Sequence, residues 1–363
     1  MPRKPSNPGP DIHRETPATS YDVALLAGVS QSAVSRCYTP GASISSKTRA
    51  KIVKAADALG YRPNAIARGL ITRRSNMVAV IITNLTNMAY PEVLFQLNQR
   101  LVERGMHLLL FTLSSERNVA QVLEEVWQYR VDGVVAAAHF SDEQIEACHA
   151  RNLPVVFYNR RSSDPHAGSV CCDHERGVRD LVERLVQAGH RRFAIVGGPP
   201  ESEVSQLRTR GAIDAIERKR GLVYDLYEGD YRYSGGREAA ARIVSARRRA
   251  DAVICANDAL AFGCIDGLRL DHGISVPGDV SVVGFDGVSA VEWASYDLTT
   301  VVQPVERMVE AAVDMLLERI ENPGLPAEAR VFSGAFREGS SARLGTAAAD
   351  SRRRAGAAAE LPG

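Results

Sequence analysis

The 363-residue chain lacks the sequence features of several large protein classes. Its six cysteines are scattered and include no C-x-x-C pair, so nothing indicates a zinc ligand cluster, and a reducing cytoplasm is the simplest expectation. The proline-rich segment 1–18 is not followed by an apolar stretch of the kind that a signal peptide or a membrane anchor needs. We therefore expect neither secretion nor a membrane partner.

Catalytic motifs are also missing. The sequence contains no G-x-S-x-G elbow, no P-loop and no H-E-x-x-H pair, and its aspartates have no obvious acid or base partner. An enzyme is therefore disfavoured, and we expect no catalytic residue, no metal site and no bound cofactor. The C-terminal segment also lacks the leucine heptads that would form an additional oligomerisation coil.

The overall charge is close to zero, but its distribution along the chain is uneven. The formal net charge is +1, whereas residues 1–75 hold twelve Lys and Arg against four Asp and Glu. The remaining residues must therefore carry a net charge of −7. A small basic segment on a mildly acidic body is typical of a protein in which only that segment contacts a polyanion.

The basic segment opens with three short predicted helices between residues 19 and 63. Thr19 or Ser20 caps the first helix and Gly28 ends it, and Ser30 caps a second helix that displays short polar side chains. A helix built only for a core would present leucine and alanine at those positions instead. The third helix is amphipathic, with Ile52, Val53, Ala56 and Leu59 expected to face inward.

From residue 76 the pattern changes to apolar strands that alternate with amphipathic helices. Near-continuous Val and Ile runs such as "NMVAVII" and "VSVVGFD" indicate parallel sheets that are buried on both faces. The alternation occurs in two series, which predicts two doubly wound lobes. Ligands bind beyond the carboxyl ends of the strands in such sheets, so we expect a site in the cleft between the lobes.

Seven segments occur in an order that carries a family signature. They are "TSYDVALLAGVSQSAVSR", "ISSKTRAKIVKAADALGYRPNAIARGL", "RVDGVVAAA", "AGHRRFAIVGGP", "CANDALAFG", "VPGDVSVVGFDG" and "LTTVVQP". Together they resemble the lactose-repressor (LacI/GalR) family of bacterial transcription regulators, from about residue 19 to 341. The resemblance implies an all-α helix-turn-helix headpiece with a hinge helix, followed by a two-lobed α/β effector domain that is similar to periplasmic binding proteins.

The same resemblance implies the domain boundaries. We expect disordered tails at 1–18 and 342–363, a DNA-binding headpiece at 19–63, a hinge helix with its linker at 64–75, and an effector-binding and dimerisation domain at 76–341. Within that domain, the first lobe is expected at about 76–174 plus 303–330, and the second at about 175–302 plus 331–341.

The headpiece resemblance implies particular DNA contacts. In a helix-turn-helix, the first residues of the second helix reach base edges in the major groove, where an amide can pair with adenine and a guanidinium with guanine. The expected base readers are Gln31, Ser32 and Arg36. Contacts to the DNA backbone or sugar, which fix the register, are expected from Tyr21, Ser30, Ala33, Ser35, Ser45 and Thr48.

Two questions about the headpiece stay open at the level of sequence. Gln31 and Ser32 could instead form an ordinary solvated helix face. After Arg36 the chain reads "CYTPGAS", where the family usually has valine and asparagine, and this puts any DNA contact from Cys37 to Pro40 in doubt.

The connector "YRPNAIARGL" matches the hinge helix of the family. The resemblance implies that this helix orders only on DNA, with two copies in the minor groove and Leu70 inserted at a central base step. Asn64, Ala67 and Leu70 would lie on one face of such a helix. The alternative is a flexible linker with an incidental leucine.

Effector contacts carry over to ten positions. In the segment that contains Asn87 and Tyr90, Met88 and Ala89 depart from the family pattern. Asn257 and Asp286 could alternatively cap turns, and Arg208 could be a structural ion-pair partner. The expected effector ligands are Asn87, Tyr90, His139, Asn159, Arg160, Arg208, Tyr231, Asn257, Asp286 and Gln303.

The function implied is that of a DNA-binding transcriptional regulator, expected to be a repressor, whose operator affinity is controlled by a small-molecule effector such as a sugar or sugar acid. The expected partners are double-stranded DNA with a pseudo-palindromic operator, the effector and a second copy of the chain. We expect a bacterial cytoplasmic protein that joins the nucleoid when it is bound. The alternative is a two-lobed solute-binding protein or sensor without a DNA role.

Leu70→Ala should weaken operator binding and reduce DNA bending, because the variant lacks the wedge that repays the cost of unstacking. Folding of the lobes and binding to random DNA should change less. Gel mobility of circularly permuted operator fragments reports the bend, and an unchanged bend in the variant would rule out the wedge.

Overall fold

The computed structural model describes residues 17–39, 41–62, 74–83, 87–113 and 118–344. The chain divides into two units, Met1–Ser75 and Asn76–Gly363. The expected hinge positions Asn64, Ala67 and Leu70, together with Pro40, lie outside the described residues. Within the described ranges, no helix is both long enough and apolar enough to cross a membrane.

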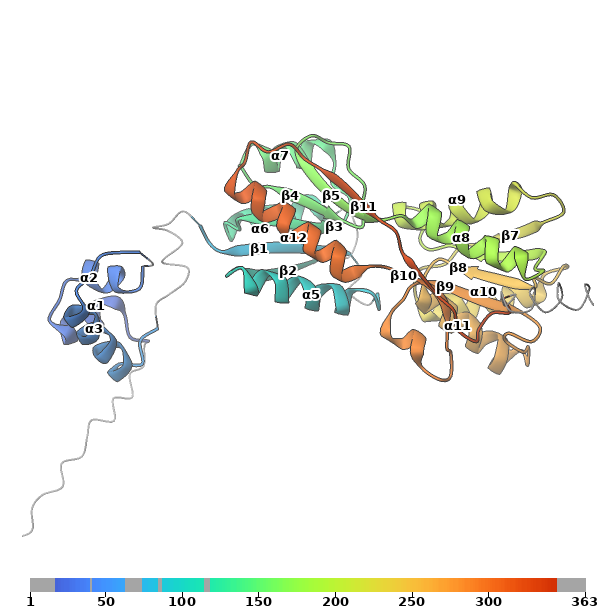
Figure 1. Cartoon of the computed structure of the whole chain (residues 1–363), viewed down its shortest axis with the longest axis horizontal. Helices are drawn as coiled ribbons and strands as arrows, with labels where there is room; N and C mark the ends of the chain where they lie inside the picture. Colours follow the sequence, from blue (N-terminus) through green and yellow to red (C-terminus); the bar gives the residue numbers. More distant parts are fainter. Residues whose placement is uncertain (1–16, 40, 63–73, 84–86, 114–117, 345–363) are drawn as a thin grey trace, which may run out of the picture. The chain divides into compact units, whose positions relative to one another are not determined.

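Three helices form the first unit (Figure 1). They pack around a small core in which Val23, Val34 and Ile52 are fully buried. The prediction that Val53 faces inward was wrong, since its side chain is 41% exposed, and Ala55 lies on the buried face instead. The helices are α1 (Ser20–Ala27), α2 (Gln31–Cys37) and α3 (Ser46–Ala58).

Local capping explains where these helices begin and end. Thr19, one of the two candidates, caps α1 by accepting from the Asp22 N–H, and the Asp22 side chain accepts from the Thr19 N–H in return. Gly28 ends α1 with a φ of 64°, a conformation that glycine adopts at little cost. Ser30 and Ser45 cap α2 and α3.

The second unit contains two six-stranded sheets, as the two series of the sequence predicted. The first sheet is parallel throughout, in the order β11-β5-β4-β3-β1-β2. Its strands are β1 (Met77–Thr83), β2 (His107–Leu113), β3 (Gly133–Ala137), β4 (Val155–Tyr158), β5 (Ala167–Cys172) and β11 (Ala329–Phe332). The helices around it are α5 (Tyr90–Glu103), α6 (Val119–Gln128), α7 (Asp142–His149) and α12 (Val305–Glu321).

The second sheet has the order β12-β10-β9-β8-β6-β7, with only β12 antiparallel to its neighbour. Its strands are β6 (Arg192–Val196), β7 (Val223–Tyr227), β8 (Ala252–Cys255), β9 (Ser281–Asp286), β10 (Thr299–Val302) and β12 (Ala335–Arg337). Its helices are α8 (His174–Gln187), α9 (Glu203–Glu217), α10 (Tyr233–Ser245) and α11 (Asp258–Asp266), with short turns η2 (Gly267–Asp271) and η3 (Ser289–Glu292).

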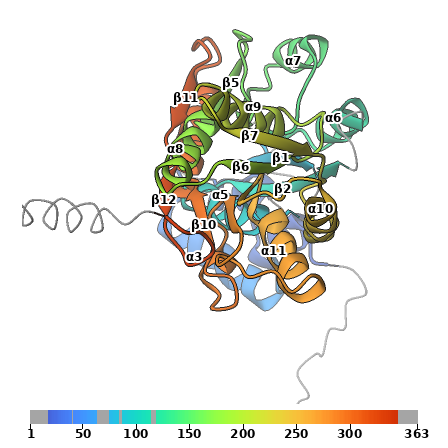
Figure 2. The ribbon, with the colours of Figure 1, turned by 90° about the vertical axis from the view of Figure 1, so that its right-hand side faces the viewer.

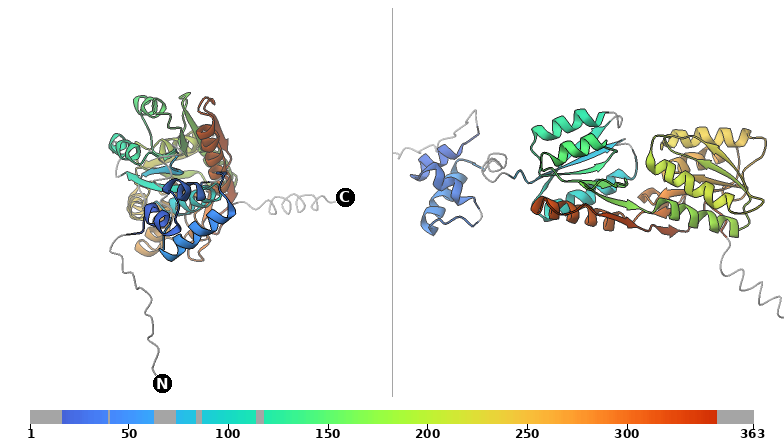
Figure 3. Two further views of the ribbon diagram at one scale, coloured as in Figure 1. Left: turned by 90° about the vertical axis from the view of Figure 1, so that its left-hand side faces the viewer. Right: turned by 90° about the horizontal axis from the view of Figure 1, so that it is seen from above.

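Each sheet is covered by helices on both faces, which explains the continuous apolar strands. In the first lobe, α5 and α12 cover one face, and α6 and α7 cover the other. In the second lobe, α8 and α9 lie on one face, while α10 and α11 lie on the other. Figure 3 shows the two lobes next to each other, each with its sheet between helical layers.

The lobes are connected three times, and two expected boundaries need correction. The chain crosses between β5 and α8, between β10 and α12, and between β11 and β12. The last crossing follows Phe332, not residue 330, because β11 pairs with β5 through Phe332. Residues 342–344 do not belong to a tail: Ala342 is buried, and the Arg343 N–H donates to the Ser281 hydroxyl.

Two glycines set the packing of α10 against α11. A Cβ at Gly263 would lie 1.9 Å from the Tyr233 carbonyl oxygen, and one at Gly236 would lie 2.1 Å from the Leu260 carbonyl oxygen. The two helices therefore cross at backbone contact. This contact places the start of α11 directly after the carboxyl end of β8.

Candidate functional site

The exposed face of α2 carries the side chains that the sequence assigned to base reading. Gln31, Ser32 and Arg36 are exposed, whereas Val34 and Cys37 on the opposite face are buried. Of the stretch from Cys37 to Pro40, Cys37 is buried: its side chain lies in the headpiece core and its carbonyl accepts from Arg49 Nη1 at 2.7 Å. Cys37 is therefore not displayed beside the three candidate readers.

Two of these candidate readers, Gln31 and Arg36, are held only loosely, whereas Ser32 Oγ lies 2.9 Å from Ser30 Oγ. Arg36 Nε donates to the Ser32 carbonyl at 3.4 Å, and Gln31 Nε2 donates to the Ser20 hydroxyl at 3.4 Å. Both distances are at the long end of hydrogen bonding, so the side chains can turn to another partner at little cost.

The expected backbone contacts are distributed over the three helices: Tyr21 lies on α1, and the others lie in or at the starts of α2 and α3. Tyr21 is 73% exposed, and Ser30 and Ser45 use their hydroxyls as caps while remaining exposed. Ser45 Oγ and Thr48 Oγ1 lie 2.8 Å apart. Free N–H groups at a helix start favour a phosphate. The remaining two positions, Ala33 and Ser35, are half-buried on α2.

A cleft of about 1760 Å³ lies between the lobes of the second unit, where the carboxyl ends of both sets of strands meet. Side chains from both lobes line it. Eight of the ten expected effector positions are among them: Asn87, Tyr90, Asn159, Arg160, Arg208, Tyr231, Asp286 and Gln303.

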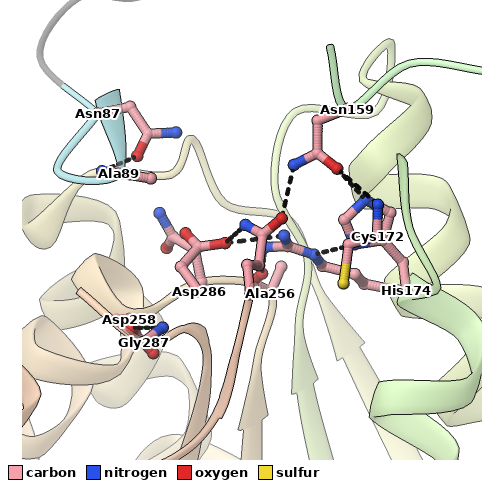
Figure 4. A network of polar contacts seen from close by, with 12 residues as sticks. Asn87, Ala89, Asn159, Cys172, His174, Ala256, Asp258, Asp286 and Gly287 are labelled. Carbon is pink, nitrogen blue, oxygen red and sulfur yellow. Dashed lines mark hydrogen bonds and ion pairs between the residues drawn. The ribbon is translucent and has the colours of Figure 1, made fainter. Parts of the chain in front are cut away.

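Polar side chains at the base of this cleft form a closed hydrogen-bonded ring (Figure 4). Arg208 Nη2 and Gln303 Nε2 both donate to Asp286 Oδ1 at 2.8 Å. Asn159 Nδ2 donates to Gln303 Oε1 at 2.8 Å, and Asn159 Oδ1 lies 3.0 Å from His174 Nε2. Arg208 Nε, at 3.3 Å from His174 Nδ1, closes the ring. Asn159 follows β4 of the first lobe, so the ring links the two lobes.

The ring fixes the protonation state of His174, a residue that the sequence interpretation missed. Because Arg208 Nε can only donate, His174 Nδ1 must accept, and the proton lies on Nε2, which donates to Asn159. Burial and then the Arg208 guanidinium lower the pKa of His174 well below its ordinary value of 6.5. Geometry and electrostatics therefore both require a neutral imidazole.

Asp286 and Arg208 form a buried ion pair, with 7% and 3% of each residue exposed. Arg208 also donates to the Ala256 carbonyl at 2.6 Å and stacks on the Phe285 ring at 3.9 Å. Burial raises the pKa of Asp286, while Arg208 opposes that shift. Among the hydrogen bonds of the described residues, none uses Asp286 Oδ2, so this oxygen is left as an acceptor at the cleft.

Asp258 supports the turn that carries Asp286. Its Oδ2 accepts from the N–H groups of Gly287 and Val288 at 2.6 and 3.0 Å, and its Oδ1 accepts from the Thr300 hydroxyl at 2.6 Å. Burial and then the Asp286 carboxylate raise the pKa of Asp258 to about 7, although these hydrogen bonds act in the opposite direction. Asp258 thus links the start of α11 to the cleft wall.

Strained backbone accompanies three of the lining residues. Asn159, Tyr231 and Asp286 have φ values of 56°, 65° and 128°, a region that residues other than glycine seldom occupy. The ring of Tyr231 packs on Gly198, where a Cβ would lie 2.4 Å from it, and its hydroxyl lies 3.1 Å from Ser202 Oγ. The packing holds the aromatic ring at the cleft wall.

Two of the ten expected effector positions, Asn257 and His139, do not line the cleft. Asn257 is 1% exposed and caps α11: its Oδ1 accepts from the Leu260 N–H at 3.0 Å and its Nδ2 donates to the Tyr231 carbonyl. The capping alternative therefore describes Asn257, which positions Tyr231 without lining the cleft. His139 is exposed and is not among the lining residues.

Charged side chains in the lining are mostly acidic. Two of the arginines that could attract an anion are already engaged: Arg208 by Asp286, and Arg232 by Asp230 at 3.8 Å. The five carboxylates are Glu92, Glu125, Glu201, Asp230 and Asp286, and the three guanidiniums are Arg160, Arg208 and Arg232. The lining suits an uncharged ligand better than an anion.

Comparison with known families gives two matches in chain order. Residues 19–64 match the family described as bacterial regulatory proteins, lacI family, and residues 182–342 match the periplasmic binding protein-like domain. The chain is 31% identical over 313 residues to the ribose operon repressor of Escherichia coli (strain K12), which covers 85% of this chain and 94% of that protein. It is 30% identical over 303 residues to catabolite control protein A of Priestia megaterium, covering 82% and 91%.

A solved structure supports the same grouping over both units. The lac repressor dimer bound to operator and the anti-inducer ONPF matches with a TM-score of 0.81 and 26% identity, covering 91% of this chain and 100% of that one.

His174→Gln should remove a pH-dependent loss of stability. A histidine whose pKa is lowered on folding contributes stability above its unfolded pKa of about 6.5, and this stability declines as the pH falls below that value. We expect the melting temperature of the wild type to fall relative to the variant between about pH 7 and pH 5. Calorimetry at several pH values tests this, and a difference that stays constant with pH would contradict the buried neutral state.

Proposed function

Because the chain belongs to the lacI family of bacterial regulatory proteins, we propose that the exposed face of α2 reads operator DNA and that the cleft binds the small molecule which controls this reading. The chain is a DNA-binding transcription regulator and not an enzyme. The observation that carries the DNA proposal is the polar display on α2: Gln31, Ser32 and Arg36 are exposed on a helix whose other face is core.

The remaining DNA contacts are proposed from position and chemistry. Hydroxyls and N–H groups at the starts of α2 and α3 suit phosphate oxygens, which set the register. The hinge contacts of Asn64, Ala67 and Leu70 rest on the sequence resemblance alone.

We propose an uncharged, hydroxyl-rich effector. Asp286 Oδ2 offers an acceptor, Tyr231 offers an aromatic surface, and the charged lining is mostly acidic. A sugar satisfies these features better than a sugar acid does. The ribose operon repressor among the relatives is named for a sugar operon.

Coupling between effector and DNA follows from the ring. A ligand can shift an equilibrium only by its preference for one state, typically about 1–3 kcal/mol in allosteric proteins. The ring joins Asn159 of the first lobe to Arg208 and Asp286 of the second, so a ligand that contacts its members favours one lobe angle.

A homodimer is proposed as the functional form, since one headpiece contacts too few base pairs for a specific site and two read the halves of a pseudo-palindrome. The matched lac repressor structure is a dimer. The protein then acts in the bacterial cytoplasm and associates with the nucleoid when bound. A solute-binding protein without a DNA role is not favoured, because residues 19–64 match the regulator family.

Arg36→Ala should weaken operator binding by about 1–3 kcal/mol and relax the preference at one base pair, as expected for a guanidinium that pairs with guanine. Lys47→Ala, at an exposed position of α3, is the matched control and should weaken all sequences alike. Selection of operators from a random pool, followed by titration of single-base variants, measures both effects. Equal weakening of specific and random DNA by Arg36→Ala would show that Arg36 is not a base reader.

Asp286→Asn should abolish the response to effector while the hydrogen bonds of the ring persist, and it should lower the melting temperature because the buried Arg208 loses its counter-ion. The amide oxygen can still accept from Arg208 and Gln303, but an NH₂ group replaces the free acceptor at the cleft. Glu201→Gln, also in the lining but outside the ring, is the control and should keep the response. A thermal-shift screen of sugars, sugar acids and nucleobases identifies the effector, since a ligand at 100 times its Kd stabilises by about 2.7 kcal/mol. An unaltered dose dependence in Asp286→Asn would contradict the assignment.

A further inference from the structure

A second basic surface lies on the second lobe, at the end opposite the cleft. Strands β8, β6 and β7 are parallel neighbours, so the loops that precede them meet at one edge of the sheet. These loops are residues 190–192, 218–222 and 246–251. Figure 2 views the molecule from the side of this lobe, with β6 and β7 toward the viewer. We call these three loops the distal edge.

The distal edge concentrates positive charge on an otherwise acidic body. It carries eight cationic side chains, although residues 76–363 together have a net charge of −7. All are exposed except Lys219, which is half-buried. They are Arg191 and Arg192 before β6, Arg218, Lys219 and Arg220 before β7, and Arg247, Arg248 and Arg249 before β8.

Nearby carboxylates do not neutralise this charge. Asp251 accepts from the backbone N–H groups of Arg191 and Arg192, and among the described residues its one guanidinium contact is with Arg192 at 3.9 Å. Glu217 accepts from the Tyr224 hydroxyl at 2.8 Å. In the described part of the chain, no ion pair involves residues 218–220 or 247–249. Six cations therefore have no acidic partner within these described ranges.

The same contacts make the distal edge a defined surface. Asp251 ties the loop before β8 to the loop before β6, and Arg191 Nη1 donates to the Val186 and His190 carbonyls. Two of the three loops are thus fixed to each other before any partner arrives. The cations are held together by backbone geometry, so binding costs less conformational freedom.

The composition of the distal edge selects the class of partner. Stable protein interfaces centre on aromatic or apolar anchors, and these three loops expose none: their one large apolar side chain, Leu222, is partly buried against the core. Guanidinium groups bind phosphate in a bidentate manner and need no apolar anchor. We propose that the distal edge binds the phosphate backbone of duplex DNA without sequence preference, as a second DNA surface besides the headpiece.

The test uses the full chain with the headpiece weakened by Arg36→Ser, Lys47→Ser and Lys51→Ser, three exposed headpiece positions. Binding of this background protein to a random-sequence duplex is measured by fluorescence anisotropy from about 50 to about 200 mM salt. Adding Arg247→Ser, Arg248→Ser and Arg249→Ser should reduce the remaining affinity by on the order of tenfold or more. The slope of log K against log salt should become shallower by about 0.9 for each phosphate that the variant no longer neutralises.

A matched control removes the same charge elsewhere. Arg176→Ser, Arg210→Ser and Arg307→Ser change three exposed arginines outside the distal edge and should leave the remaining duplex affinity and its salt slope unchanged. Equal reductions of affinity in the two triple variants would overturn the proposal, since the duplex would then respond only to net charge. Polyglutamate serves as a probe that mimics an acidic protein. If it binds the distal edge more tightly than duplex DNA does at equal salt, the proposal is overturned in favour of an acidic protein partner.

Discussion

The buried pair of Arg208 and Asp286 is the interaction on which the cleft depends. Removing two charges from water costs more than their attraction returns unless further hydrogen bonds satisfy both groups, and leaving one partner alone typically costs about 3–5 kcal/mol. Here the Ala256 carbonyl, His174 and Gln303 supply those bonds. These three groups and the two paired residues come from five different segments, so the need to satisfy one ion pair determines how those segments of the second lobe and its crossings meet.

The ring also explains how an event in the cleft can be felt across both lobes. Asn159, which follows β4 of the first lobe, is oriented from both sides: its oxygen faces His174 and the Cys172 N–H, and its nitrogen faces Gln303. Since every donor in the ring faces an acceptor, one member cannot turn without leaving its neighbour unpaired. Asp258 adds a second restraint behind the turn of Asp286, and its pKa is raised first by burial and then by the neighbouring Asp286 carboxylate.

Sequence patterns predicted the elements whose signals are local. The caps at Thr19 and Ser30 and the glycine stop at residue 28 were readable because capping involves neighbours in the chain. Strand β5, "AGSVCC", was not anticipated, because its small residues lack the Val and Ile enrichment of the other buried strands. Cleft residues at strand ends were found through the family resemblance, whereas His174 was missed because its partners are separated from it by 15 and 34 positions. Asn257 was predicted as an effector ligand but caps a helix. An asparagine after a strand can serve either role, and the sequence does not show which groups lie next to it in the fold.

The clustering of charge on the second lobe likewise depends on which residues the fold brings together. The runs at 191–192, 218–220 and 247–249 each read as ordinary solvated ends of secondary structure, and the body that contains them is acidic overall. Parallel pairing of β8, β6 and β7 brings the three runs to one edge, because neighbouring strands that point the same way begin at the same side of the sheet. The topology that gathers polar side chains at the carboxyl ends of these strands therefore also gathers cations at their amino ends. The second sheet thus contributes one wall of the acidic cleft at one end and presents an arginine-rich surface at the other, and neither follows from the net charge of the chain.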